Sequence, residues 1–275
     1  MTTIGLLHPG AMGAAIGGQL VHAGHRVLWC PTGRSQATAK RAATAGLTPS
    51  DDLQQLLGEA DVVLSICPPA SAEDLARTAT AYTGTWVEAN AITLQRAQRI
   101  AELLPASRVV DAGIVGSPPL NGKRPTLYLS GPEGTNATAG LFTGTDVRTH
   151  ILGERIGQAS ALKLSYSAYQ KASRVLAAVS YGLALDHGVD QELLDVAGKR
   201  PGSYLVETSY IPKIAARAWR WGPELLEAAD MLDEAGLPDD MLRAAAAILA
   251  RWEPAKNDNR MDVDQALAQL RDPAG

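Results

Sequence analysis

The sequence predicts an α/β domain built on a parallel sheet, then one long helix, and then an all-α domain. Short apolar segments alternate with helical patterns through the first 155 residues. Strand-like segments stop near residue 157, and the pattern over 158–187 is helical without a break. Apolar strands that alternate with helices are typical of a parallel sheet covered on both faces. We therefore expect two domains, 1–155 and 156–275, with the long interdomain helix opening the second.

In the first domain, strands and helices follow one another in regular order. Runs rich in β-branched and other apolar residues predict the strands, at 3–7, 26–30, 61–67, 85–89, 108–112, 125–130 and 146–152. Apolar residues at helical spacing predict the helices between them, at 12–23, 35–45, 71–82 and 93–104. The first of these helices ends at Gly24, which is a typical residue after a helix C-terminus.

The second domain contains only helical patterns. A helix over 158–187 would be a rod of roughly 45 Å. Gly236 and Pro238 mark the end of one helix and Asp239 the start of the next. Together with the apolar spacing, these signals predict helices at 190–198, 204–219, 223–235, 239–252 and 262–271.

Charge and composition exclude several classes of partner. The chain has 275 residues, 46% of them hydrophobic, and a net charge of −4. No basic stripe is present, so we expect no nucleic acid partner. The longest apolar runs fall short of the ~20 residues that a membrane helix needs, so we expect no membrane partner. The N-terminus enters a strand directly, without the charged start of a signal peptide.

The cysteines and histidines argue against a disulfide framework and against a metal site. Cys30 and Cys67 are far apart, and two isolated thiols suit a reducing, cytoplasmic compartment. The histidines, at 8, 22, 25, 150 and 187, show no zinc-ligand spacing. We expect a cytoplasmic protein without a metal ion.

The stretch TIGLLHPGAMG resembles a dinucleotide-binding loop in which one glycine is missing. A strand runs into His8, Pro9, Gly10, Ala11, Met12 and Gly13, and a helix follows. The loop of a Rossmann-like domain reads G-x-G-x-x-G, and its last two glycines allow approach of the pyrophosphate and close helix packing. Gly10 and Gly13 keep those two roles. His8 precedes a proline, which favours extended backbone, so the turn is expected at Pro9 and Gly10.

This loop would bring the helix N-terminus to a phosphate group, so residues 8–13 are expected to bind a dinucleotide. His8 either contacts the pyrophosphate or is an exposed residue at the strand end. The second strand is followed by WCPTGRS, without the acidic residue that NAD sites usually carry there. Thr32, Arg34 and Ser35 instead offer donors for a 2′-phosphate. We expect NADPH (NADP+) as cofactor, in preference to NADH.

Three blocks of sequence resemble the β-hydroxyacid dehydrogenase superfamily, which includes 6-phosphogluconate and 3-hydroxyisobutyrate dehydrogenases and the imine reductases. They are IGLLHPGAMG for the cofactor loop, VVDAGIVGSPP for the substrate segment and GQASALKLSYSAYQK for the catalytic segment. The stretch ARAWRWGPELLEAADML is similar to a subgroup labelled phosphogluconate-dehydrogenase-like, whose substrates are mostly unassigned. The resemblance extends over nearly the whole chain.

The resemblance implies an oxidoreductase in which Lys163 is the acid/base of hydride transfer. Ser167, one turn later, stands where the family often has asparagine, and Lys171 lies nearby as a substrate-binding candidate. Gly116, Ser117 and Pro118 replace the family's Ser-Gly-Gly, and their backbone N–H groups could bind a carboxylate. The resemblance also implies that Pro68 passes the adenosine side of the cofactor and that Asn90 lies near the nicotinamide.

The resemblance further implies a homodimer in which the long helices pair. The substrate is expected to be a small polar hydroxy or keto compound of the β-hydroxy acid type. Two alternatives stay open: an imine reductase on the same fold, and a non-catalytic NADPH-binding protein. Lys213, Arg217 and Arg220 accompany Trp219 and Trp221. They either hold an anionic group or belong to a helix that packs its tryptophans at a dimer interface.

Overall fold

The computed structural model describes residues 1–105, 107–186, 188–199, 202, 204, 207–234 and 239–271. The chain forms two compact units, Met1–Lys163 and Leu164–Gly275. The division falls inside the long helix, whereas the expected boundary lies before it. The helix end expected at Gly236 and Pro238 lies outside the described residues.

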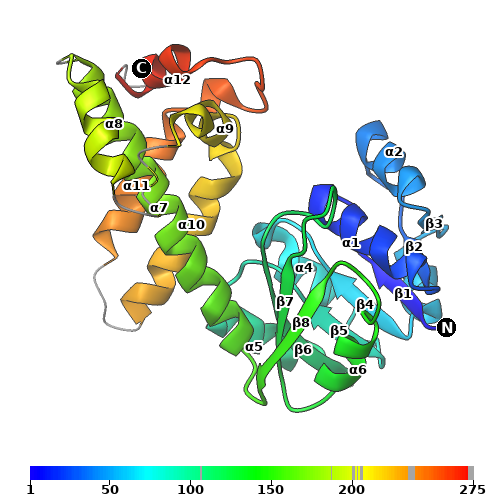
Figure 1. Ribbon diagram of the computed structural model, residues 1–275. Coiled ribbons are helices and arrows are strands. Elements are labelled where there is room, and N and C mark those ends of the chain that lie inside the picture. The colour runs from blue at the N-terminus through cyan, green and yellow to red at the C-terminus, as the bar shows by residue number, and fades with distance from the viewer. Residues whose placement is uncertain are drawn as a thin grey trace. The chain divides into compact units, whose positions relative to one another are not determined.

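The first unit is built on an eight-stranded sheet with the order β3-β2-β1-β4-β5-β6-β7-β8 (Figure 1). The strands are β1 (Thr3–Leu6), β2 (Arg26–Trp29), β3 (Thr48–Pro49), β4 (Val62–Ser65), β5 (Thr85–Glu88), β6 (Arg108–Val115), β7 (Thr126–Ser130) and β8 (Arg148–Gly153). All neighbouring pairs are parallel except β6 and β7. The α/β Rossmann-like architecture and the helical region after it are confirmed.

The antiparallel pair corrects the expectation of a wholly parallel sheet. The loop between β6 and β7 is too short for the crossover that a parallel connection needs. Asn121 and Gly122, at its tip, have φ angles of 53° and 77°. Positive φ at two successive residues is typical of a tight hairpin turn, and Asn-Gly is its commonest sequence. This dipeptide was the available signal for the hairpin.

Helices cover both faces of the sheet because successive strand residues point to opposite faces. One apolar cluster joins Ile4 and Leu6 of β1 to Ile16 and Leu20 of the first helix. The second apolar cluster contains Trp86 of β5 and residues of the helices α3, α4 and α5, whose bounds are given below. The helices of this unit are α1 (Ala11–His22), α2 (Gln36–Thr44), α3 (Leu53–Glu59), η1 (Pro69–Ser71), α4 (Ala72–Arg77), α5 (Leu94–Leu103) and α6 (Thr135–Gly140).

The regular elements in the described part of the second unit are all helices. Its elements are the rest of α7 (Gln158–Asp186), α8 (Asp190–Gly198), η3 (Thr208–Tyr210), α9 (Ile211–Ala215), α10 (Ala218–Glu234), α11 (Asp240–Ala250), η4 (Glu253–Ala255) and α12 (Val263–Arg271). Leu225 and Ala229 of α10 are buried, as are Leu242 and Leu249 of the neighbouring α11. None of the described helices is long and apolar enough to cross a membrane.

The helix expected at 204–219 is wrong as a single element. A 3₁₀ turn over 208–210 leads into the short helix α9, and α10 begins at Ala218. Pro223 lies inside α10 rather than at the start of a new helix. Its missing N–H costs one hydrogen bond near the helix start, which the buried face of α10 offsets.

Candidate functional site

The expected cofactor and substrate residues of the first unit gather at the carboxyl edge of the sheet. In the sheet, β2 and β3 lie on one side of β1, and β4 lies on its other side. The chain reverses direction across the sheet there, so a topological switch point lies between β1 and β4. Ligands of open α/β sheets bind outside the carboxyl ends of the strands at such a point. The segments that follow β1, β2, β4, β5 and β6 at this edge carry the predicted residues, which are 8–13, 32–35, 68, 90 and 116–118.

The loop after β1 keeps the geometry that the two remaining glycines predict. The N–H of Gly10 donates to the carbonyl of His8 at 2.9 Å, so the turn closes around Pro9 as expected. Gly10 is the N-cap of α1, and Ala11 and Met12 are its first residues. A Cβ atom at Gly13 would clash with the backbone oxygen of His8. Gly13 therefore lets the helix pack against the strand end.

His8 lies beside the loop with one unsatisfied ring nitrogen. Its ring approaches the position that a Cβ atom would take at Gly10, within 3.2 Å. Nδ1 is buried and has no hydrogen-bond partner among the described residues. Burial lowers the pKa of His8, and the guanidinium groups of Arg34 and Arg41 lower it further. The imidazole is therefore neutral near pH 7, with one donor and one acceptor nitrogen.

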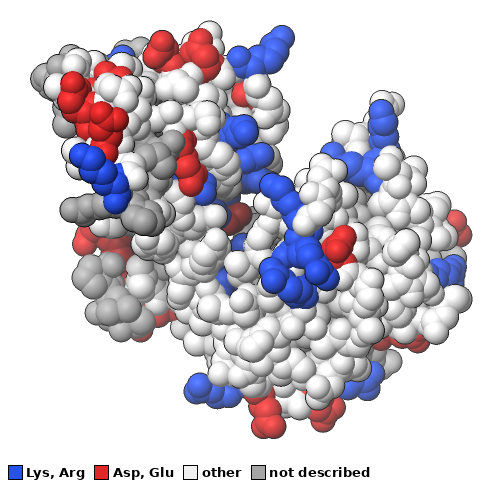
Figure 2. All heavy atoms as spheres, in the orientation of Figure 1, with Lys and Arg blue, Asp and Glu red and all other residues white. Residues whose placement is uncertain are grey.

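Two arginines hold the carbonyl groups of this loop. Arg34 Nη2 donates to the carbonyl of Leu7 at 3.1 Å, and its Nε is buried without a partner in the described part of the chain. Arg41 Nε donates to the carbonyl of Pro9 at 3.4 Å. Arg41 was missed in the sequence, although a basic residue in the helix after β2 was a usable signal. Figure 2 shows basic side chains gathered over α2, which carries Lys40 and Arg41.

The other two predicted residues of this segment have distinct positions. Thr32 is exposed in a turn that the Arg34 N–H closes on the carbonyl of Pro31 at 3.0 Å. Ser35 is the N-cap of α2, and its Oγ accepts from the N–H of Thr38 at 3.3 Å. Ser35 thus starts the helix that carries Arg41.

Asn90 is buried and links the carboxyl ends of β4 and β5. Its Oδ1 accepts from the N–H of Cys67 at 2.6 Å, and its Nδ2 donates to Ser65 Oγ at 2.9 Å and to Glu88 Oε1 at 2.5 Å. Burial raises the pKa of Glu88 to about 7. Asn90 therefore fixes the loop that continues to Pro68, which precedes the 3₁₀ turn η1.

The segment after β6 forms a stiff loop next to α1. Gly116 has a φ of 124°, and a Cβ atom there would lie 3.0 Å from Cα of Pro125. Ser117 is exposed, and the carbonyl of Pro118 accepts from the N–H of Leu120 at 2.8 Å. Gln19 of α1 donates to the carbonyl of Pro119 at 3.4 Å, so this hydrogen bond joins α1 to the loop after β6.

Lys163 is positioned by close packing of α7 on β6. A Cβ atom at Gly113 would lie 2.7 Å from the backbone oxygen of Ala159 and 3.0 Å from Cβ of Lys163. The buried carboxylate of Asp111 accepts from the N–H groups of Gly157, Ala159 and Ser160 at 2.9–3.0 Å. The first turn of α7 therefore lies beside Asp111, and the helix then packs over Gly113. This arrangement places Lys163 toward the carboxyl end of β6.

Ser167 and Lys171 follow Lys163 on α7 at intervals of one turn, and both are buried. Lys171 forms an ion pair with Glu224, and its Nζ lies 5.6 Å from the centroid of the Trp221 ring. This contact engages Lys171 in the packing of the helical unit. Among the described residues, no group of His, Cys, Asp and Glu side chains could hold a metal ion.

The comparisons with known proteins agree with this arrangement. Residues 3–87 match the model of the family described as NADP oxidoreductase, coenzyme F420-dependent. Residues 184–252 match a domain of unknown function, DUF1932. The conserved protein MTH1747, of unknown function, is described as structurally similar to 3-hydroxyacid dehydrogenases. It shares 25% identity over 92% of this chain and 97% of its own, with a TM-score of 0.71.

This chain has the fold of the 3-hydroxyacid dehydrogenases. The 3-hydroxyisobutyrate dehydrogenase of Mycobacterium tuberculosis, solved with L-serine, has a TM-score of 0.79 at 22% identity, over 99% of this chain and 100% of its own. A reductive aminase from Aspergillus terreus, solved with NADPH and ethyl levulinate, has a TM-score of 0.57 at 18% identity, over 98% of this chain and 100% of its own. The resemblance to the β-hydroxyacid dehydrogenase superfamily is thus confirmed at the level of the fold.

Proposed function

We propose that this chain is an NADPH-dependent oxidoreductase that acts on a small polar hydroxy or keto compound. The observation that carries the proposal is the phosphate loop, in which Gly13 packs against His8 while Arg34 and Arg41 hold the loop carbonyls. The match of residues 3–87 to an NADP oxidoreductase family supports the same cofactor.

The residues present fit NADPH. Gly10 and Gly13 keep side chains away from the start of α1, where backbone N–H groups attract a pyrophosphate. The unpartnered Nε of Arg34 is a donor of the kind that phosphate oxygens satisfy, and Nδ1 of His8 is another in the tautomer protonated at that nitrogen. In this proposal His8–Gly13 hold the pyrophosphate and Arg34, Arg41, Thr32 and Ser35 the 2′-phosphate. Pro68 borders the adenosine side and Asn90 the nicotinamide side.

When bound, the cofactor supplies the hydride as NADPH or accepts it as NADP+. Lys163 gives a proton to the substrate oxygen during reduction and removes it during oxidation, and its ammonium group stabilises negative charge on that oxygen. Ser167 supports this exchange from one turn along α7. The N–H groups at Gly116 and Ser117, beside the rigid Pro118, bind the substrate carboxylate. Lys171 acts in substrate binding through its position on the same helix.

The test combines cofactor titration with turnover. Tight binding of NADPH and weaker binding of NADH are expected in a fluorescence titration of the full chain. A screen of hydroxy acids and keto acids is then expected to give turnover that Lys163→Ala reduces by ~10²–10⁴-fold without loss of NADPH binding. Near-normal turnover in Lys163→Ala would remove the lysine from the mechanism.

The two alternative functions give different results in the same assay. The fold also occurs in a reductive aminase that binds NADPH. Turnover that requires an added amine together with a ketone would identify imine reduction. NADPH binding without turnover on any carbonyl, alcohol or imine would identify a non-catalytic binding protein.

We also propose a homodimer that pairs through α7. Leu162, Tyr166 and Tyr169 are exposed by 36%, 42% and 68%, and their spacing of four and three places them on one face of the helix. Sedimentation is expected to show a dimer, and Tyr166→Glu is expected to weaken it.

We also propose a cytoplasmic location. Cys30 and Cys67 are free thiols, which fits a reducing compartment.

A further inference from the structure

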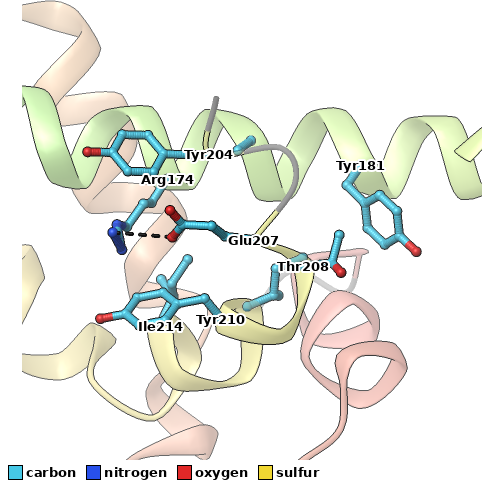
Figure 3. Close-up of a pocket in the computed structure, with 9 residues that line it drawn as sticks. Arg174, Tyr181, Tyr204, Glu207, Thr208, Tyr210 and Ile214 are labelled. Carbon is cyan, nitrogen blue, oxygen red and sulfur yellow. Dashed lines mark ion pairs between the residues drawn. The ribbon is translucent and has the colours of Figure 1, made fainter. Parts of the chain in front are cut away.

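A guanidinium group stacked between two tyrosine rings lies in the helical unit. Cζ of Arg174 is 4.6 Å from the ring centroid of Tyr204 and 4.3 Å from that of Tyr210. Figure 3 shows the guanidinium between the two rings, with both tyrosine hydroxyls pointing to the side toward which the guanidinium extends. Because rings cover its two faces, a polar partner can approach this group only along its edge.

The edge of the Arg174 guanidinium is incompletely satisfied. Nη2 lies 3.3 Å from a carboxylate oxygen of Glu207, and the Arg174 side chain is 13% exposed. Nε and Nη1 are buried and have no hydrogen-bond partner among the residues that the structure describes. Buried donors of native proteins are almost always paired, and an unpaired charged donor is especially costly. The two nitrogens therefore indicate a ligand.

Two further cations lie against Tyr210, one of the residues that line the pocket. Arg217 Nη1 donates to the hydroxyl of Tyr210 at 3.3 Å, and Lys213 Nζ lies 5.9 Å from the centroid of that ring. Among the lining residues, Arg174 is the basic one and Glu207 the acidic one. Among the charged side chains that the described contacts place at this pocket or at Tyr210, Glu207 is outnumbered by Arg174, Lys213 and Arg217. The excess positive charge favours an anion over a cation or a neutral group.

We propose that this pocket is a carboxylate-binding site in which Arg174 is the anchor and Glu207 is a resident carboxylate that the ligand displaces. A carboxylate is planar and can lie in the plane of the guanidinium, between the two rings, with two parallel hydrogen bonds. A phosphate is tetrahedral and thicker than this slot favours. The site takes a small organic acid, and the residues that line it all belong to the helical unit.

The size of the pocket explains why Glu207 must move. The cavity has a volume of about 10 Å³, which is room for one water molecule. The Glu207 side chain is 43% exposed, so its carboxylate can turn to solvent without being buried elsewhere. Its departure leaves the edge of Arg174 open. Substitutions of Arg174 and of Glu207 are therefore expected to have opposite effects on the affinity for the ligand.

Calorimetric titration of the full chain with sodium succinate, at constant ionic strength set with sodium chloride, tests the site. Succinate is expected to bind the wild-type chain, to bind Glu207→Gln at least 10-fold more tightly, and to lose binding in Arg174→Gln. Arg174→Lys keeps the positive charge but lacks the two parallel N–H donors of the guanidinium, so at least a 10-fold loss of succinate affinity is expected. Thermal unfolding and NADPH titration of each variant show whether the two units remain folded.

Three results would overturn the proposal. They are succinate binding that Arg174→Gln leaves unchanged in a folded chain, weaker binding in Glu207→Gln, and no binding in either the wild-type chain or Glu207→Gln. A parallel titration with sodium phosphate is expected to give weaker binding, and a preference for phosphate would contradict the carboxylate assignment. Because NADPH binding is measured separately, failure of this site is distinguishable from failure of the proposed oxidoreductase function.

Discussion

Ser160 Oγ donates a 2.5 Å hydrogen bond to Oδ1 of Asp111, which joins the first turn of α7 to the middle of β6. The other oxygen of this carboxylate accepts from Ser130 Oγ and from three backbone N–H groups. These N–H groups at the helix start would otherwise lack partners. Asp111 therefore determines where α7 begins, and with it the position of Lys163.

Replacing this carboxylate is expected to damage both stability and turnover. Asp111→Asn introduces an amide whose N–H₂ cannot accept from the helix N–H groups. Since hydrogen bonds to a charged group contribute ~1.5–3 kcal/mol each, we expect a loss of roughly 3 kcal/mol in urea unfolding. Turnover is expected to fall more than NADPH affinity, because Lys163 moves and the phosphate loop does not. Ser160→Ala, which removes one bond, should have a smaller effect, and equal stability of Asp111→Asn and wild type would contradict this role.

The contact between Gly13 and His8 predicts a position where alanine is not tolerated. A Cβ atom at Gly13 meets the rigid backbone oxygen of His8, so the loop must shift. Gly13→Ala is expected to raise the Kd for NADPH at least ~10-fold, a loss of ~1.4 kcal/mol. Gly58 in α3 is the matched control because a Cβ atom there meets nothing within 4 Å. Gly58→Ala should leave the Kd unchanged and stabilise the helix by ~0.5–1 kcal/mol.

Arg41 is expected to determine the choice between NADPH and NADH. If its guanidinium binds the 2′-phosphate, Arg41→Ala loses a charge-assisted contact of ~1.5–3 kcal/mol, which is ~10–150-fold in the Kd for NADPH. The Kd for NADH should change little. Lys40, the exposed neighbour on α2, is the control for general positive charge. Equal weakening by Lys40→Ala, or equal effects on both cofactors, would show that Arg41 makes no specific contact.

Glu88 is expected to make stability depend on pH. Burial raises its pKa from 4.5 to about 7, so the folded chain holds a proton that the unfolded chain releases above pH 4.5. The free energy of unfolding should therefore fall as the pH rises from about 4.5 to about 7 and then level off. The size of this change is on the order of 3 kcal/mol.

Glu88→Gln is the matched variant for that measurement. Trp86 Nε1 and Asn90 Nδ2 donate to different carboxylate oxygens, so the amide oxygen can keep one of these hydrogen bonds, and the amide carries no titrating proton. Urea unfolding between pH 5 and 8 should show a smaller pH dependence in the variant. A difference in stability between the two proteins that stays constant over this range would mean that Glu88 does not titrate there.

Local sequence signals predicted much of the first unit. Apolar runs and the alternation with helices located seven of the strands close to their observed positions, and the glycines of the cofactor loop gave its turn. The strand β3, at 48–49, and the helices α3 and α6 were missed. They are short, and packing rather than propensity stabilises such elements. Asp52, whose carboxylate accepts from the N–H of Gln55 at 2.8 Å, was the available signal for α3.

The fold class, the place of the phosphate loop and the face of α7 that carries Lys163 can all be predicted from the sequence, because each follows from periodicity and from residue type at fixed spacing. Which distant side chains meet is seen only in the folded chain. Asp111 reaches the start of α7 across about 46–49 positions, Arg41 reaches the loop at Pro9, and Arg174 stacks with Tyr204 and Tyr210. Such contacts depend on how strands and helices pack, and the local sequence patterns used for prediction do not specify that packing.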